Sequence, residues 1–224
     1  LRPDDSFLAL EPNPVFHAFL RENFGASSGV TILQVVCGDS PARTLSGSWR
    51  IAPGTAQFYP SAHGGLPIPH TTLDTCISGT PWETEARLLK IDTDGHDFAV
   101  LRGGRRFLAS RQPAVLFECA PHGNPAFLEH ALEVLQLLAR AGYESILVYN
   151  NFGHLLSVDP LADPAPMRAR LQHQLSHGGY YLDLLTMPQL QLAEFHRREL
   201  AVFQHLDTRD FPGHSTAPHP EQKG

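Results

Sequence analysis

The chain has 224 residues, a length typical of one domain with a substantial core. Its 17 Lys and Arg residues are outnumbered by 23 Asp and Glu residues, and no basic run appears, which argues against a nucleic-acid partner. No apolar stretch reaches the roughly 18 residues that span a bilayer and no signal peptide is evident, so we expect no membrane partner and a cytoplasmic location.

In the first part of the chain, apolar β-branched runs alternate with segments of helical spacing, which is typical of a parallel sheet covered by helices. The first strand is predicted at Ser6 to Glu11, and the helix after it begins at Pro14 and ends at Gly25. Val30 to Cys37 is the next predicted strand. The stretch rich in Gly, Pro and Ser from Ser40 to His70 is either a set of β-hairpins or a substrate-facing insertion.

The second part continues the same alternation and ends in a polar segment. The predicted strands are Arg87 to Asp92, buried on both faces, then Ala114 to Cys119, and a closing pair at Glu144 to Asn150 and Tyr180 to Pro188 that can be antiparallel. The predicted helices are one containing Phe98 to Leu108, one at Pro125 to Ala141 and one at Gln189 to His205. We therefore expect a domain over residues 1–206 and a disordered tail over residues 207–224.

Acidic residues stand where several of these strands end, which is where an open parallel sheet binds ligands. Glu11 ends the first strand and can accept both hydroxyls of a ribose; its alternative role is that of a carboxylate favoured by the dipole of the next helix. Asp39 follows the second strand, where a carboxylate can accept from an adenine amino group, and this favours the ribose role for Glu11. Glu118 lies near the end of a later strand.

The densest group of such residues is LLKIDTDGHD, from Leu88 to Asp97. Asp92 closes a strand and can orient or deprotonate a hydroxyl, whereas Asp97, and by the same reasoning Asp94, suit helix capping. His96 is a candidate base near neutral pH or simply an exposed residue at a helix start. Alternatively, the carboxylates hold Mg²⁺ or Ca²⁺, but no complete ligand set is identifiable, so no metal ligand is assigned.

Four blocks in this order make the chain similar to the FkbM family of S-adenosylmethionine-dependent methyltransferases. They are ALEPNPVFHAFLREN from Ala9, TTLDT from Thr71, LLKIDTDGHDFAVLRGGRRFL from Leu88 and PAVLFEC from Pro113. The resemblance extends from about residue 7 to residue 150. Its most specific part is KIDTDGHD followed by VLRGG, and the EPNP block is the second anchor.

The resemblance implies an α/β fold of the Rossmann-like class I methyltransferase type, with a mostly parallel sheet of about seven strands whose last strand is antiparallel. It implies an enzyme that transfers a methyl group from S-adenosylmethionine to a hydroxyl of a small molecule or glycan. The residues that it assigns to the cofactor are Glu11, Asn13, Cys37, Gly38, Asp39 and Asp92. Those that it places at the site of methyl transfer are Asp92, the first choice for the acceptor's proton, with Asp94, His96 and Glu118.

One departure from the family pattern concerns the glycine-rich loop of its first strand, because nothing like it precedes Ser6. In this family the strand that carries the loop lies between those ending at Glu11 and Asp92, so we expect two unpaired strand edges there. We also expect that the sequence is a fragment or a truncated gene product of an enzyme and binds the cofactor weakly or not at all. A neighbouring chain could supply the strand in a homo-oligomer. The alternatives are a non-catalytic binding module on the same scaffold and a metal-dependent O-methyltransferase.

Overall fold

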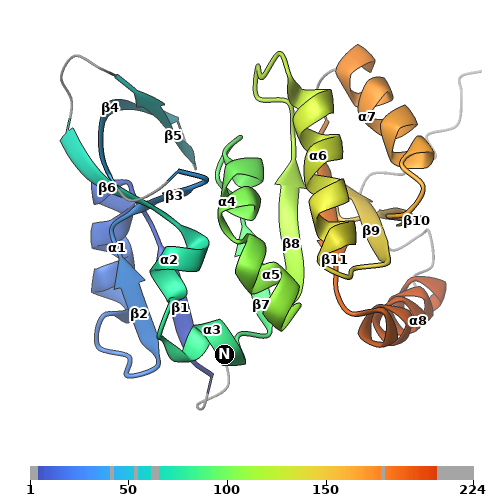
Figure 1. The fold of residues 1–224 in the computed structure, drawn as a ribbon, viewed down its shortest axis with the longest axis horizontal. Coiled ribbons are helices and arrows are strands. Elements are labelled where there is room, and N and C mark those ends of the chain that lie inside the picture. Colours follow the sequence, from blue (N-terminus) through green and yellow to red (C-terminus); the bar gives the residue numbers. More distant parts are fainter. Residues whose placement is uncertain (1–4, 41–42, 53–54, 62–65, 178–179, 206–224) are drawn as a thin grey trace, which may run out of the picture. The chain divides into compact units, whose positions relative to one another are not determined.

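The computed structural model describes residues 5–40, 43–52, 55–61, 66–177 and 180–205. These residues form an α/β fold with mixed sheets, in which strands and helices alternate along the chain (Figure 1). Residues 1–188 make up one compact unit and residues 189–224 another. The predicted disordered tail lies outside the described residues, and the division into a domain and a tail stays a prediction.

The N-terminal part is a β-α-β unit. Strand β1 (Phe7–Leu10) pairs in parallel with β2 (Val30–Leu33), and helix α1 (Pro14–Phe24) connects them. The helix begins after Asn13, whose side-chain oxygen accepts from the first free amides, and Pro14 fits the first turn because its missing N–H needs no partner there. The strand and helix predicted here are confirmed, although α1 buries none of its residues completely.

The predicted single strand from Val30 to Cys37 is wrong, because this run forms two strands in two different sheets. After β2 the chain leaves the first sheet, and β3 (Val36–Gly38) pairs in parallel with β6 (Leu66–Thr72) in a four-stranded sheet. Strands β4 (Arg43–Ala52) and β5 (Thr55–Pro60) complete that sheet as antiparallel hairpins. The stretch rich in Gly, Pro and Ser is thus built of β-hairpins, one of its two predicted alternatives.

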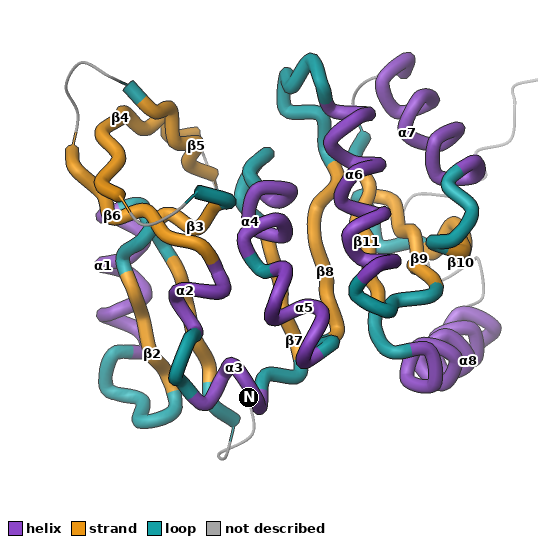
Figure 2. Tube along the Cα trace, viewed as in Figure 1, coloured by secondary structure: helices purple, strands orange, loops and turns teal. Residues whose placement is uncertain are grey.

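The sequence after β6 forms short helices, and the single helix predicted around Phe98 to Leu108 is in fact two. Helices α2 (Leu73–Ile77) and α3 (Pro81–Glu85) precede β7 (Leu88–Ile91), and α4 (Asp97–Gly103) and α5 (Arg105–Arg111) follow it. Figure 2 shows α4 and α5 as successive turns of helix joined at Gly104. The Asp74 carboxylate explains the new start, because it accepts from the amides of Arg106 and Phe107 at 3.0 and 2.9 Å.

The glycine pair of the VLRGG block has a packing role. A methyl group added at Gly103 would overlap the carbonyl oxygen of Gly38, so the end of α4 approaches the backbone of β3 closely enough that only glycine fits. At Gly104 an added methyl would meet the end of the Leu73 side chain at 2.9 Å, which is a softer contact.

The second half of the chain builds a five-stranded sheet in the order β10-β9-β11-β8-β7. Strand β8 (Ala114–Cys119) is parallel to β7, and β11 (Leu182–Thr186) is antiparallel to both β8 and β9 (Ser145–Asn150). The predicted antiparallel closing pair is therefore confirmed as β9 and β11. Strand β10 (Leu155–Pro160) and helix α7 (Ala165–His177), which lie between them in sequence, were not predicted.

Strands β1 and β7 each have a single hydrogen-bonded neighbour in the part of the chain that the structure describes. Strand β1 pairs with β2, and β7 pairs with β8 at the edge of the five-stranded sheet. The two unpaired edges that we expected at these strands are present. The prediction that β7 is buried on both faces is wrong, because the face with Leu88 and Lys90 is exposed: Leu88 keeps 61 % of its exposure, and only Ile91 is buried.

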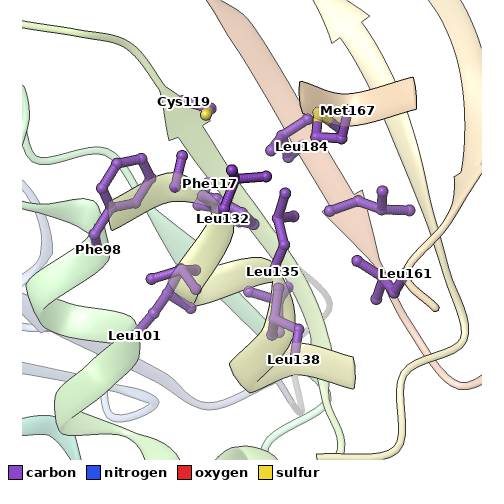
Figure 3. Packing of buried hydrophobic residues seen from close by; sticks show 14 of the residues in the cluster. Phe98, Leu101, Phe117, Cys119, Leu132, Leu135, Leu138, Leu161, Met167 and Leu184 are labelled. Carbon is purple, nitrogen blue, oxygen red and sulfur yellow. The ribbon is translucent and has the colours of Figure 1, made fainter. Parts of the chain in front are cut away.

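The main hydrophobic core lies between the five-stranded sheet and the helices that cover it. Helix α6 (Phe127–Arg140), predicted at Pro125 to Ala141, supplies six buried residues, and α4 and β8 face it (Figure 3). Phe117 on β8 and Leu101 on α4 are almost fully buried here, and each side chain of this size contributes about 1.5–3 kcal/mol on burial. This core holds β7 and β8, whose ends carry the candidate site.

The second unit contains one described helix, α8 (Gln189–His205), with the predicted bounds. None of the helices in the described residues combines the length and apolar character needed to cross a membrane.

Candidate functional site

The candidate site begins at the carboxyl ends of β7 and β8. These strands are parallel, so their ends lie at the same edge of the sheet (Figure 1). The loop after β7 carries Asp92, Asp94 and His96, and Glu118 lies one residue before the end of β8. In antiparallel register, Asp183 of β11 stands directly opposite Glu118. The sheet topology thus gathers several carboxylates that are distant in sequence.

Asp92 lies at the exposed margin of this group. Its carboxylate accepts a hydrogen bond from the Lys90 ammonium at 2.6 Å, and its side chain keeps 58 % of its exposure. Because this ion pair is solvated, it contributes little to stability and leaves the carboxylate accessible. Asp92 is placed where an incoming hydroxyl can reach it.

Asp97, predicted as a helix cap or a partner of the helix dipole, lies in the first turn of α4 and also anchors the loop. Its carboxylate accepts from the hydroxyl of Thr93 at 2.7 Å and from the amide of Glu118 at 3.3 Å, so it ties the β7 loop to β8. The side chain is almost wholly buried, and burial raises its pKa above the usual value. His96 occupies the cap position of α4 without a side-chain capping bond and is exposed.

His122 is a residue of the site that the sequence reasoning missed. Its Nε2–H donates to Oε1 of Glu118 at 3.0 Å, and the two side chains keep only 22 % and 12 % of their exposure. The hydrogen bond with Glu118 is the main cause that raises the pKa of His122, against the effect of burial. His122 neither ends a strand nor starts a helix: it lies four residues after Glu118, in the turn that leads to α6.

Asp94, Glu118 and His122 converge so that one potential ligand atom from each lies within 4.8 Å of the others. The β7 loop brings Asp94 into place with a positive φ of 50°. Gly95 beside it allows the imidazole to pack on the loop, because a methyl group there would lie 2.8 Å from Cβ of His122. The structure thus unites two of the predicted catalytic residues, Asp94 and Glu118, with a histidine.

Negative charge is concentrated around Glu118. Asp183, directly across the sheet, has its pKa raised first by burial and then by the charge of Glu118. Like charges in directly opposed positions of antiparallel strands are destabilising. Among the described residues, Lys90 pairs with Asp92 and the His122 ring hydrogen-bonds with Glu118. This end of the sheet is therefore suited to a cationic or hydrogen-bond-donating ligand.

The predicted cofactor residues Glu11 and Asn13 lie together at the end of β1. Oε1 of Glu11 accepts from the amide of Asn13 at 2.7 Å, and burial raises the pKa of Glu11. The side-chain oxygen of Asn13 caps α1, whereas its Nδ2 is buried and has no hydrogen-bond partner among the described residues. This end of β1 thus offers a carboxylate and an unused amide donor.

Asp39, Gly38 and Cys37 form a separate group at the end of β3. Asp39 accepts from Nε of Arg102 at 3.0 Å and from the hydroxyl of Ser40 at 3.3 Å, and the arginine helps to hold the pKa of Asp39 below its usual value. Gly38 lies close to the His70 ring, and Cys37 packs against the hydrophobic core. The ion pair with Arg102 fixes Asp39 against α4, a contact that the sequence does not reveal.

Comparison with known proteins identifies the family. The model of the methyltransferase FkbM domain matches residues 3–145, which is more than half of the chain. The chain belongs to the FkbM methyltransferase family. The resemblance inferred from the sequence blocks is thereby confirmed, and membership of this FkbM family implies methyl transfer.

A solved structure is also similar, the crystal structure of methyltransferase FkbM from Methylobacillus flagellatus KT. The sequence identity is 16 %, the TM-score is 0.40, and the match covers 63 % of this chain. It covers 32 % of the other chain, so this FkbM domain spans about a third of that protein. No curated protein matches the sequence.

Proposed function

We propose that the protein is an S-adenosylmethionine-dependent O-methyltransferase that acts on a hydroxyl group of a small molecule or glycan in the cytoplasm. The proposal includes a Rossmann-like class I arrangement of the sheet. Family membership supports methyl transfer. The observation that carries the cofactor assignment is the pair formed by Glu11 and the unpartnered amide of Asn13 at the end of β1.

The residues at β1 and β3 fit parts of this cofactor. One carboxylate oxygen of Glu11, Oε1, accepts from the Asn13 amide, and the second oxygen is suited to accept from a ribose hydroxyl. The buried Nδ2 of Asn13 is costly without a partner, and a ribose oxygen would satisfy it. Asp39 has less remaining capacity to accept a hydrogen bond from an adenine amino group, because Ser40 and Arg102 already donate to its two oxygens.

S-adenosylmethionine supplies a methyl group on a positively charged sulfur. The protein's part is to align an acceptor hydroxyl with that methyl group and to accept the hydroxyl proton as the C–O bond forms and the C–S bond breaks. We assign the proton to Asp92, which is accessible, and the orientation of the acceptor to the group that contains Asp94 and Glu118. The exposed His96 is the weakest of the predicted catalytic residues.

Calorimetric titration with S-adenosylhomocysteine tests the cofactor site. Replacing Glu11 by Gln removes the charge and one acceptor, and should weaken binding by at least about tenfold. Asn13→Ser keeps a good helix cap but loses the amide donor, so it should weaken binding while α1 stays folded. Glu129→Gln, an exposed carboxylate on α6, is the matched control.

Two results would contradict the proposal. Unchanged affinity in both the Glu11→Gln and Asn13→Ser proteins would move the cofactor elsewhere. Failure of the natural chain to bind S-adenosylhomocysteine at all would favour the alternative, a non-catalytic module that keeps the methyltransferase scaffold.

The catalytic assignment has its own test. Asp92→Asn should leave the affinity for S-adenosylhomocysteine unchanged and slow methyl transfer to a hydroxyl acceptor by about 10²–10⁴-fold. Normal turnover by this variant would remove Asp92 from the mechanism.

The open edges of β1 and β7 bear on assembly, because an unpaired edge can pair with a strand of another chain. We propose a homo-oligomer as a possible state of this chain, and sedimentation velocity distinguishes it from a monomer. Nucleic acid and membrane are not among the proposed partners.

A further inference from the structure

The donor set at the end of β8 has the composition of a transition-metal site. We propose that Asp94, Glu118 and His122 bind one divalent metal ion of the Mn²⁺, Fe²⁺, Co²⁺ or Zn²⁺ type. The catalytic role of the ion rests on the proposed O-methyltransferase function. Binding of the ion can be tested independently of that function. His122 is the residue that turns a group of carboxylates into a mixed nitrogen and oxygen set.

The separations between the donor atoms match a coordination sphere. Ligands about 2.1 Å from a metal and at right angles to each other lie about 3.0 Å apart, and opposite ligands lie about 4.2 Å apart. Nε2 of His122 and Oε1 of Glu118 are 3.0 Å apart, and the three donor atoms all lie within 4.8 Å of one another. A metal ion could therefore take the place of the hydrogen between His122 and Glu118, with Asp94 as the third ligand.

The surroundings of the site favour an ion over a proton. Asp183 stands directly opposite Glu118 across the sheet, a like-charge pairing that strands normally avoid. Asp97 adds a buried carboxylate that accepts from the Glu118 amide and so holds the strand end in place. A divalent cation would neutralise charge that a single imidazolium offsets only in part.

The imidazole is also held in position before any ligand arrives. Gly95 lies against Cβ and the ring of His122, so the loop that carries Asp94 fixes where the ring can lie. Preorganised ligands of this kind reduce the ordering that metal binding requires.

The nature of the donors limits the choice of ion. An imidazole with two carboxylates suits first-row transition metals, whereas Mg²⁺ and Ca²⁺ prefer oxygen donors throughout. Three protein ligands leave coordination positions open, and a hydroxyl bound at one of them loses its proton more readily. In an O-methyltransferase that open position is where the acceptor oxygen would bind.

Titration of the full chain with Mn²⁺, followed by electron paramagnetic resonance and calorimetry without any cofactor, tests the site. We expect one ion per chain. Glu118→Gln and His122→Gln should each weaken binding by at least about tenfold, and Glu129→Gln should leave it unchanged. His122→Gln is decisive, because it removes the nitrogen ligand without adding or removing a carboxylate charge.

Circular dichroism of each variant shows whether it is folded, and the absorption spectrum of bound Co²⁺ in the unaltered chain reports the nitrogen ligand independently of any substitution. The proposal is overturned if Mn²⁺ does not bind below about 1 mM, or if folded His122→Gln protein binds as the natural chain does. If the unaltered chain binds Mn²⁺ but does not bind S-adenosylhomocysteine, the proposed function is wrong and the metal site is supported.

Discussion

Replacing Gly103 by alanine should destabilise the protein, although helix propensity alone predicts the opposite. Alanine is favoured over glycine in a helix by about 1 kcal/mol, and Gly103 is the last residue of α4. The added methyl group, however, would overlap the carbonyl oxygen of Gly38. Both partners are backbone, so no side-chain rotation relieves the overlap, and overpacking of this kind costs about 1–3 kcal/mol.

Urea unfolding followed by circular dichroism measures this effect. We expect a lower midpoint for Gly103→Ala, and a fall in Tm of about 2–4 °C for each kcal/mol lost. Gly104→Ala is the control, because its methyl group meets the flexible end of Leu73, and it should cost clearly less. If Gly103→Ala were as stable as the natural chain, the close approach of α4 to β3 would be refuted.

Three further predictions concern stability and pH. Asp74→Ala removes the acceptor for the first amides of α5 and should lower the free energy of unfolding by about 1 kcal/mol, and an unchanged urea midpoint would argue against the cap. Tyr143→Phe leaves the buried carbonyl of Pro113 without its 2.8 Å hydrogen bond and should lower the free energy of unfolding by about 1–3 kcal/mol in the same assay. An unchanged urea midpoint would contradict this role of Tyr143. Burial raises the pKa of Cys37 from 9.0 to about 12. The folded chain therefore holds this proton more tightly than the unfolded chain, and the free energy of unfolding should fall as the pH rises above about 9. At pH 8 the thiol should react with a disulfide reagent about a thousandfold more slowly than an ordinary cysteine, and fast reaction in the folded state would show that it is not buried.

Local pattern was sufficient for the bounds of two elements. The predicted strand at Ala114 to Cys119 has the bounds of β8, and the helix at Gln189 to His205 has those of α8. Hydrophobic periodicity decides such elements within their own residues.

Elements that depend on distant partners were predicted less well. The run from Val30 to Cys37 is uniformly apolar, and no local signal shows that its halves pair in different sheets. Helix α7 has few buried residues, so its sequence shows no broad apolar face that would indicate a helix. Burial of β7 was overestimated because an apolar run does not reveal which face of the strand other elements cover.

The candidate site was predicted in part. Strand ends pointed to Glu118 and Asp94, because topology alone brings such positions together. The contact of His122 with Glu118 depends on a turn after β8, and that of Arg102 with Asp39 depends on how α4 packs on β3. His122 lies only four residues after Glu118, so their spacing was a local signal, whereas no local motif links Arg102 with Asp39, 63 residues earlier in the chain.

The passage of the chain from β2 to β3 links two sheets through only Gln34 and Val35. Glu11 directly follows β1 of the first sheet and Asp39 directly follows β3 of the second, so a nucleoside that contacted both would act as a cross-link between them. Its binding energy would then appear as resistance of both sheets to thermal unfolding. At a hundred times its dissociation constant such a ligand adds about 2.7 kcal/mol, a gain that a melting experiment can detect before any reaction is known.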